Sequence, residues 1–325
     1  MRSTQLNPKK SRLLSVTGVN QARIWCILGF LALSFAGVCP AQVDPELQKL
    51  EINNQNHLSY RKYLADNPRG VVLYLHGIQS HSGWYVQSCE ILAENGYTVY
   101  APDRRGSGLN RHDRGHVQNY EDLIADLDAF VAQMRADFPN LPVFLMSVSW
   151  GGKLALLYEA MRPGKVDGVI LSTPGIRPQV DLPLWDKMRV FYYCWRRREI
   201  QPMIPVPIGR ADMFTDDVEW QNWIEQDPLT LRRCTARFFW ESNQVDKAIK
   251  KQISNCKAPF LLQLAGRDEI VNNRKTVKFL KRNLPGAETN RLEVIEYPEA
   301  RHTLEFESDM REIVMDAVAW LNRWS

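Results

Sequence analysis

The fold of this chain is decided by the stretch VFLMSVSWGG, residues 143–152. Its apolar first half is typical of a strand buried on both faces, and strong helix formers follow from Lys153 onward. Between the two the backbone must reverse within about two residues, so small side chains are needed on either side of the tip. Ser147 and Gly151 supply these small side chains. The stretch therefore predicts a strand, a tight turn and a helix, with Ser149 at the tip.

A serine in this position is characteristic of a nucleophile elbow, which lifts the hydroxyl above the end of the sheet. The backbone N–H of the next residue, Trp150, then points at the place where an oxyanion develops. The motif commonly has glycine where this chain has Ser147, a mild departure because serine is also small. The alternative is that the small residues serve packing alone, as they do in many α/β proteins.

Residues 1–41 are predicted to be a signal peptide or an N-terminal anchor. Basic residues precede an apolar run at 24–38, and the small residues at 39–41 offer a cleavage site. The run of about 15 residues is shorter than the roughly 20 of a spanning helix, which favours export to the periplasm or exterior over anchoring. The long basic segment keeps the anchor open as an alternative. The mature domain is expected to cover residues 42–325.

Composition excludes few classes of function. The 325 residues suffice for one large α/β domain or two smaller ones. The 41 basic and 37 acidic residues are mixed along the chain and give a net charge of +4, so nucleic-acid binding is not expected. No C-x-x-C pair is present, and neither a metal nor a cofactor is expected. The four cysteines after the leader are expected to be buried free thiols.

Strand and helix patterns alternate along most of the chain. Buried strands are expected at 71–75, 98–101, 143–148, 166–172, 260–265 and 291–297, and helices at 83–94, 117–138, 276–283 and 305–324. This order predicts an α/β fold with a mostly parallel central sheet flanked by helices. One or two edge strands are expected within residues 47–64.

Residues 175–255 have a different character, because prolines and aromatic residues cluster there and strand periodicity disappears. They are expected to form a helical lid over the carboxyl edge of the sheet, where α/β folds bind ligands. The stripe FYYCW at 191–195, followed by three arginines, is interpreted as lid core capped by a basic turn. The alternative is that this stripe makes transient contact with a membrane surface.

Polar residues follow three of the expected strands. His76-Gly77-Ile78 follows the first buried strand, and the N–H of Ile78 is a candidate second oxyanion donor beside that of Trp150. Asp268 follows the strand at 260–265, and His302 lies between the last strand and the last helix.

With these pieces in this order, the chain resembles the α/β-hydrolase superfamily, and within it the monoacylglycerol lipase and lysophospholipase group with its neighbouring serine peptidases. The resemblance covers roughly residues 55–324. It rests on His76-Gly77, DRRGSG at 103–108, the elbow, GRDEIV at 266–271, and His302. It implies an α/β-hydrolase fold and a catalytic serine, acid and histidine in that chain order.

Elimination assigns these roles to residues. His302 is the only one of six histidines that follows the elbow, and it is the candidate base. The loop after the strand at 166–172 contains no carboxylate, so Asp268 is the candidate acid, with Glu269 as the alternate. Each residue alone has another interpretation, Asp268 as a helix cap and His302 as an ordinary loop histidine. The combination favours a Ser149, His302 and Asp268 triad.

The expected function is hydrolysis of a carboxylic ester through an acyl-enzyme, with a small lipid-like monoacyl substrate. One alternative is an aminopeptidase or amidase of the same fold. Such an enzyme needs carboxylates to hold a free amine, and the lid offers Asp181, Asp186, Glu199 and Asp212. The other alternative is a non-catalytic binding protein, against which the complete set of three residues argues.

Overall fold

A computed structural model describes residues 45–53 and 56–325 of the chain. The predicted signal peptide or anchor, residues 1–41, lies outside the described residues, so its cleavage and the export of the protein stay predictions. Within the described ranges, no helix has the length and apolar character needed to cross a membrane.

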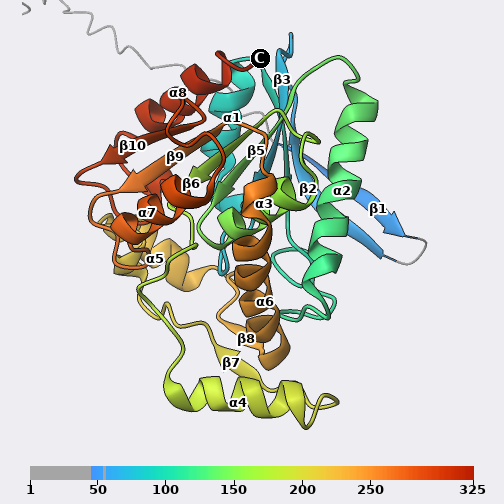
Figure 1. Cartoon of the computed structure of the whole chain (residues 1–325), viewed down its shortest axis with the longest axis vertical. Helices are drawn as coiled ribbons and strands as arrows, with labels where there is room; N and C mark the ends of the chain where they lie inside the picture. The colour runs from blue at the N-terminus through green and yellow to red at the C-terminus, as the bar shows by residue number, and fades with distance from the viewer. Residues whose placement is uncertain (1–44, 54–55) are drawn as a thin grey trace, which may run out of the picture. The chain divides into compact units, whose positions relative to one another are not determined.

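An eight-stranded sheet forms the centre of the described chain (Figure 1). From one edge to the other its strands are β1 (Glu46–Asn53), β2 (Asn56–Tyr63), β4 (Tyr97–Pro102), β3 (Gly70–Leu75), β5 (Val143–Val148), β6 (Gly168–Ser172), β9 (Phe260–Ala265) and β10 (Leu292–Tyr297). β2 runs antiparallel to both of its neighbours, and every other pairing in this sheet is parallel. The predicted fold class, a mostly parallel sheet of an α/β protein, is confirmed.

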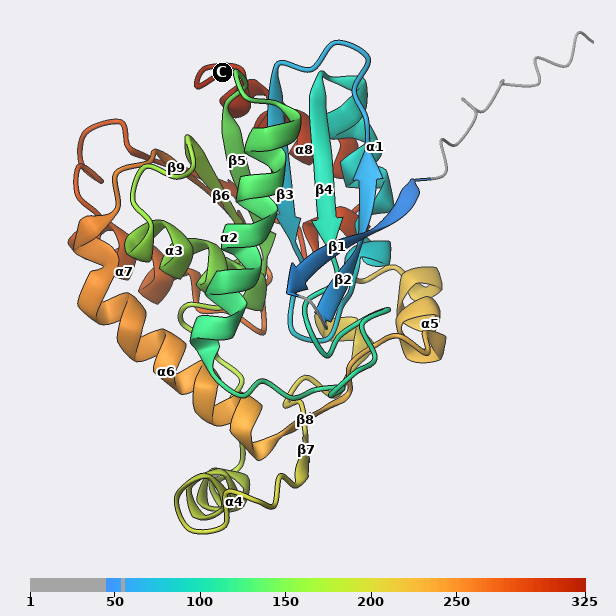
Figure 2. The ribbon, with the colours of Figure 1, turned by 90° about the vertical axis from the view of Figure 1, so that its right-hand side faces the viewer.

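Helices cover both faces of this sheet. α1 (Val86–Glu94) and α8 (Met310–Leu321) pack together on one face, while α2 (Tyr120–Asp137) and α3 (Trp150–Met161) lie on the other (Figure 2). α7 (Asn273–Asn283) connects β9 to β10. The four cysteines at positions 89, 194, 234 and 256 are buried and free, as predicted.

Three helices begin later than the sequence pattern indicated. A separate turn precedes two of them. Residues Ser82–Trp84 form a short 3-10 turn before α1. Asp103 holds this turn in place by accepting hydrogen bonds from the N–H and the hydroxyl of Ser82, both at 2.7 Å. A second 3-10 turn, Leu304–Phe306, precedes α8. α2 begins at Tyr120 rather than at 117.

Strand order brings two loops together at the carboxyl edge of the sheet. β3 lies between β4 and β5 in the sheet. After β3 the chain continues to β4 on one side of it, and after β4 it crosses back to form β5 on the other side. Such a switch point opens a crevice at the carboxyl ends of the strands. Leu75 at the end of β3 pairs with Ser147 near the end of β5. The loop that begins at His76 therefore lies beside the turn that carries Ser149.

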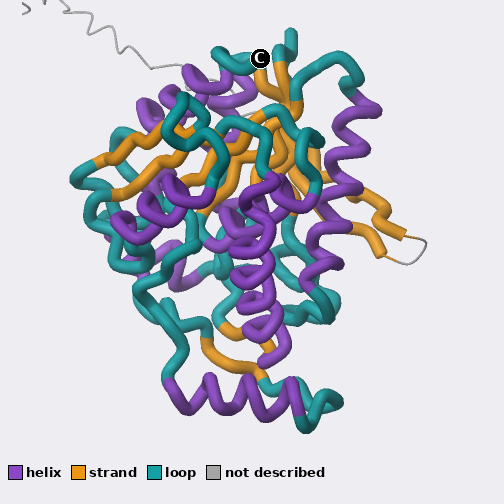
Figure 3. Tube along the Cα trace, in the orientation of Figure 1, coloured by secondary structure: helices purple, strands orange, loops and turns teal. Residues whose placement is uncertain are grey.

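The insertion, residues 175–255, leaves the sheet after β6 and returns to it at β9. It contains three α-helices and two short strands, namely α4 (Leu184–Trp195), β7 (Met203–Pro205), α5 (Val218–Gln226), β8 (Arg233–Thr235) and α6 (Ala236–Gln252). Figure 3 shows these helices and strands by colour. The expectation that this segment lacks strands is wrong, since β7 and β8 form an antiparallel pair. α6 packs against both α3 and α4.

The interpretation of residues 191–195 as lid core is wrong for most of these side chains. Phe191 is 56% exposed, Tyr192 48% and Trp195 63%, whereas Cys194 is buried. Leu184, Trp185 and Met188 on the same helix are also exposed. α4 therefore presents an apolar surface to solvent, and we call these six exposed side chains the α4 stripe.

The close approach of α3 to β3 gives a first prediction, on Gly151. A Cβ atom there would lie 2.6 Å from the carbonyl oxygen of His76 and 2.7 Å from that of Leu75, so the backbone would have to shift. We expect Gly151→Ala to lower the free energy of unfolding by about 1–3 kcal/mol in urea denaturation. Gly209→Ala is the matched control, because a Cβ there meets no atom within 4 Å. Equal stability of the two variants would contradict the prediction.

Candidate active site

Ser149 occupies a strained turn between β5 and α3. Its backbone has φ 54° and ψ −120°, a region that residues with side chains rarely adopt. The turn is held from both sides, because Ser149 N–H donates to Ser172 O at 3.0 Å and Ser149 O accepts from Gly152 N–H at 2.9 Å. This conformation is that of a nucleophile elbow, and it places the hydroxyl at the carboxyl edge of the sheet.

The hydroxyl of Ser149 lies next to His302. The distance from Ser149 Oγ to His302 Nε2 is 2.9 Å, and both residues are buried. The rings of His302 and of Phe214 from the insertion meet in an edge-to-face arrangement, with 6.0 Å between ring centroids. A residue from the end of β10 and one from the end of β5 thus meet although they are far apart in the chain.

Asp268 holds the other side of the imidazole. Its Oδ2 lies 2.8 Å from His302 Nδ1, while its Oδ1 accepts hydrogen bonds from the N–H groups of Ile270 and Val271 at 2.8 and 2.9 Å. A carboxylate with these donors can only accept from His302, so Nδ1 carries the proton and Nε2 is free to accept from Ser149. The alternate acid, Glu269, pairs instead with Arg301.

The two candidate oxyanion donors, Ile78 and Trp150, line the same cavity as Ser149. The N–H of Trp150 stands in the first turn of α3, where backbone donors have no helical acceptor. No backbone carbonyl of the described residues accepts a hydrogen bond from Ile78 N–H. Both groups are therefore free to donate to a bound ligand.

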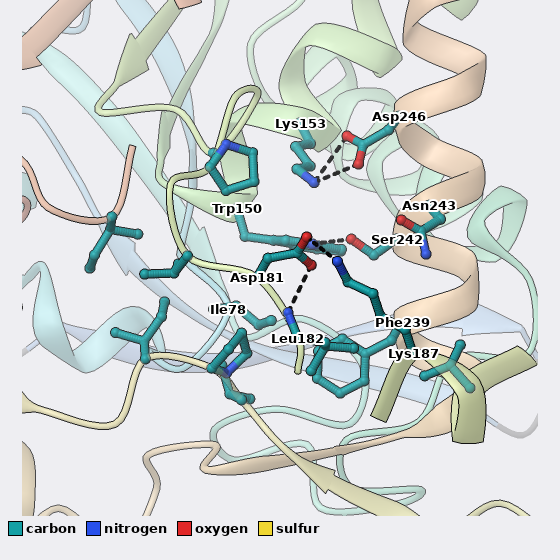
Figure 4. Close-up of a pocket in the computed structure, with 18 of the residues that line it drawn as sticks. Ile78, Trp150, Lys153, Asp181, Leu182, Lys187, Phe239, Ser242, Asn243 and Asp246 are labelled. Atoms are coloured by element: carbon teal, nitrogen blue, oxygen red, sulfur yellow. Dashed lines mark hydrogen bonds and ion pairs between the residues drawn. The ribbon is translucent and has the colours of Figure 1, made fainter. Parts of the chain in front are cut away.

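The cavity beside Ser149 has a volume of about 440 Å³ and lies between the sheet edge and the insertion (Figure 4). One part of its wall is apolar and includes Val180, Leu182, Val206, Ile208 and Phe239. Another part is polar, with the Lys153–Asp246 ion pair at 2.9 Å and the Asp181–Lys187 pair. Ser242 accepts a hydrogen bond from the indole N–H of Trp150 at 2.9 Å.

Sequence reasoning missed two kinds of residue in this site. Lys153 and Asp246 give the cavity part of its polar wall, and the available signal was a lysine one turn after Ser149 in a mostly apolar helix. The aromatic rings of the insertion that contact the site, such as Phe214, gave no signal of their own. Their sequence neighbourhood does not distinguish them from other aromatic residues of the insertion.

Comparisons with known proteins show which curated sequences the chain is similar to. The chain is 27% identical over 218 residues to phospholipase YtpA of Bacillus subtilis, which covers 66% of this chain and 82% of that protein. It is 25% identical over 258 residues to a monoacylglycerol lipase of Mycolicibacterium smegmatis, covering 78% of this chain and 89% of that protein.

Solved structures show the same fold. A soluble variant of monoglyceride lipase from Saccharomyces cerevisiae, in complex with a substrate analog, superposes with a TM-score of 0.75 at 20% identity, covering 86% of this chain and 96% of that one.

A family model described as serine aminopeptidase, S33, matches residues 66–309, well over half of the chain. This protein belongs to that family, and it has the α/β-hydrolase fold.

Proposed function

We propose that the protein is a serine hydrolase that cleaves carboxylic esters of monoacyl lipids, as a monoacylglycerol lipase or lysophospholipase does. One observation carries the proposal: the continuous hydrogen-bonded chain from Asp268 through His302 to Ser149, beside a cavity. The similarity to a phospholipase and a monoacylglycerol lipase supports the same substrate class.

In the proposed mechanism Ser149 is the nucleophile and His302 the base. His302 Nε2 takes the hydroxyl proton as Ser149 Oγ attacks the ester carbonyl, and it returns the proton to the leaving alcohol. Asp268 holds the imidazole in the required tautomer and stabilises the imidazolium. The N–H groups of Ile78 and Trp150 donate to the oxyanion. Water then hydrolyses the acyl-enzyme with His302 acting as base again.

The two parts of the cavity wall suit the two parts of a monoacyl ester. The apolar part offers a surface for the acyl chain, since burying a CH₂ group contributes about 0.8 kcal/mol. The polar part carries donors and acceptors for an alcohol portion that bears hydroxyl groups. Because its cations are paired with carboxylates, the polar wall favours a neutral or zwitterionic head group over a strongly anionic one.

An aminopeptidase of the same fold is the second candidate, because the family description names that activity. Such an enzyme needs a carboxylate free to bind the substrate amine. The four candidate carboxylates in the insertion are all paired with cations, as the pairs Asp181–Lys187, Asp186–Arg189, Glu199–Arg197 and Asp212–Arg210. A substrate amine would have to displace these cations, which favours the ester hydrolase.

We also propose that the insertion acts as a lid whose α4 stripe contacts a lipid surface. The side chains of Leu184 and Trp185 are 75% and 70% exposed, an unusual degree for large apolar groups. Three arginines, at positions 196–198, directly follow the helix and suit the anionic head groups of a membrane. This arrangement is typical of helices that lie in the membrane interface.

The first prediction of this proposal concerns the nucleophile. Ser149→Ala is expected to lower the turnover of a p-nitrophenyl ester by at least ~10³-fold, because a triad member is lost. Ser147→Ala is the control, since Ser147 Oγ only donates to Ile170 O at 3.0 Å within the sheet. We expect that control to keep its turnover and its reaction with a fluorophosphonate probe. An essential Ser147 would show that the nucleophile is misassigned.

The second prediction separates the two neighbouring carboxylates. Asp268→Asn is expected to cost on the order of 10⁴-fold in turnover, because an amide there favours the wrong imidazole tautomer. Glu269→Gln should retain nearly full turnover, since it removes only a half-exposed ion pair with Arg301. Circular dichroism would verify that both variants fold. A severe loss in Glu269→Gln alone would move the acid to Glu269.

The third prediction tests the α4 stripe by sedimentation with vesicles that contain anionic lipid. The double variant Trp185→Ser with Met188→Ser should bind at least roughly 10-fold more weakly, because each exposed side chain contributes about 1.5–3 kcal/mol when buried. Val218→Ser is the control, an equally exposed apolar residue on α5. Hydrolysis of a soluble short-chain ester should be unchanged in both. If the double variant and the Val218→Ser control bound the vesicles equally well, membrane contact through α4 would be refuted.

A further inference from the structure

Arg104 is a buried cation that forms no ion pair with a carboxylate of the described residues. It follows β4, its side chain is buried, and none of the ion pairs in the described part of the chain includes it. Burial lowers the pKa of its guanidinium to about 10, so the group remains charged at neutral pH. Burying an unpaired charge costs free energy unless other contacts compensate. The burial of Arg104 therefore needs an explanation in its other contacts.

The guanidinium of Arg104 is bound by the loop that follows β3. Its Nη1 donates to Gly77 O and its Nη2 to Ile78 O, both at 3.1 Å. One face of the group lies over the ring of Trp150, 4.7 Å from the centroid. The ring of Phe238, from α6 of the insertion, lies 5.5 Å away. Arg104 thus contacts the segments that carry both candidate oxyanion donors.

The bond to Gly77 O sets the direction of a candidate donor. That carbonyl and the N–H of Ile78 belong to the same peptide unit, and in a trans peptide they point in opposite directions. Holding the carbonyl toward Arg104 therefore turns Ile78 N–H away from Arg104. The loop lies directly against the nucleophile, since a Cβ on Gly77 would be 3.3 Å from Ser149 Cβ.

His76 binds the same carbonyl from its own side. Its Nε2 accepts the backbone N–H of Arg104 at 2.9 Å, so the ring proton is on Nδ1, which donates to Gly77 O at 2.8 Å. Burial and the charge of Arg104 lower the pKa of His76 to about 3, which keeps the ring neutral in this tautomer. The Gly77 carbonyl is thus held by two donors.

We propose that Arg104 is a positioning residue for the oxyanion hole, holding the Gly77–Ile78 peptide, together with His76, so that Ile78 N–H meets the oxyanion. A cation at the carbonyl end of the peptide also polarises it and makes its N–H a stronger donor. This inference rests on the proposed function, because it assumes that Ile78 N–H stabilises the intermediate of ester hydrolysis.

The test uses Arg104→Met in the full chain, which keeps a side chain of similar length but removes both donors and the charge. We expect kcat for p-nitrophenyl butyrate, per site titrated with a fluorophosphonate, to fall roughly 10- to 100-fold, with KM changed less than about two-fold. Affinity for an alkyl boronic acid, which forms a tetrahedral adduct with the serine, should fall by a similar factor. If Arg104 had a purely structural role, the substitution would lower the number of titratable sites, while kcat per titrated site and KM would both stay unchanged.

Arg105→Met is the matched control, because it removes the same group one position later. Arg105 pairs with Asp126 of α2, and among the described residues none of its side-chain hydrogen bonds goes to the Gly77–Ile78 peptide. Its kcat and boronate affinity should match those of the unmodified protein.

Arg104→Lys keeps the charge, and it tests the positioning role of Arg104 if Arg104→Met does not fold. A lysine lacks the fork that reaches two carbonyls, so we expect an intermediate loss of kcat, with KM again preserved. Unchanged kcat per titrated site in both Arg104 variants, with Ser149→Ala inactive, would overturn this inference and leave the proposed function standing. Full turnover in Ser149→Ala would instead overturn the proposed function.

Discussion

The structure depends on one close contact, between the first turn of α3 and the carboxyl end of β3. Gly151 approaches the carbonyl oxygens of Leu75 and His76 so closely that no side chain fits. This approach requires the tight turn at Ser149 and its positive φ. It also brings Ile78 and Trp150 to one cavity. The strain of a single residue is therefore maintained by packing between two neighbouring parallel strands and the helix that follows one of them.

The polar groups around this contact are held by backbone atoms as much as by one another. Asp268 accepts two backbone N–H groups, and Arg104 donates to two backbone carbonyls. In the insertion, Asp227 likewise accepts a backbone N–H, that of Leu229 at 2.9 Å, and it also accepts hydrogen bonds from the side chains of His81 and Trp84, each at 3.0 Å. Backbone partners do not change with rotamer, so the site is preorganised before any substrate enters.

Much of this could be predicted from the sequence, because the informative signals were local. The buried strands, the elbow at Ser149 and the single downstream histidine, His302, each follow from neighbouring residues or from elimination. The α4 stripe could not be predicted correctly, since an apolar stripe has the same spacing whether it meets a core or solvent. β7 and β8 are three residues each, too short for a periodic signal. The contacts of Arg104 join the segments that follow β3, β4 and β5, and the spacing of residues along the chain does not reveal such contacts.

α4 joins the two proposals about the substrate, because its two sides face different surroundings. Val190 is buried and lines the cavity that contains Ser149, while Leu184 and Trp185 face solvent. A lipid surface contacted through the α4 stripe would thus lie one helix away from the nucleophile. An acyl chain leaving that surface could then enter the cavity with little exposure to water, which avoids most of the cost of hydrating its CH₂ groups. The exposed aromatic residues of α4 contribute little to folding, because they gain no burial in the folded protein. The proposed uptake of substrate from a lipid phase gives a physical reason for their presence.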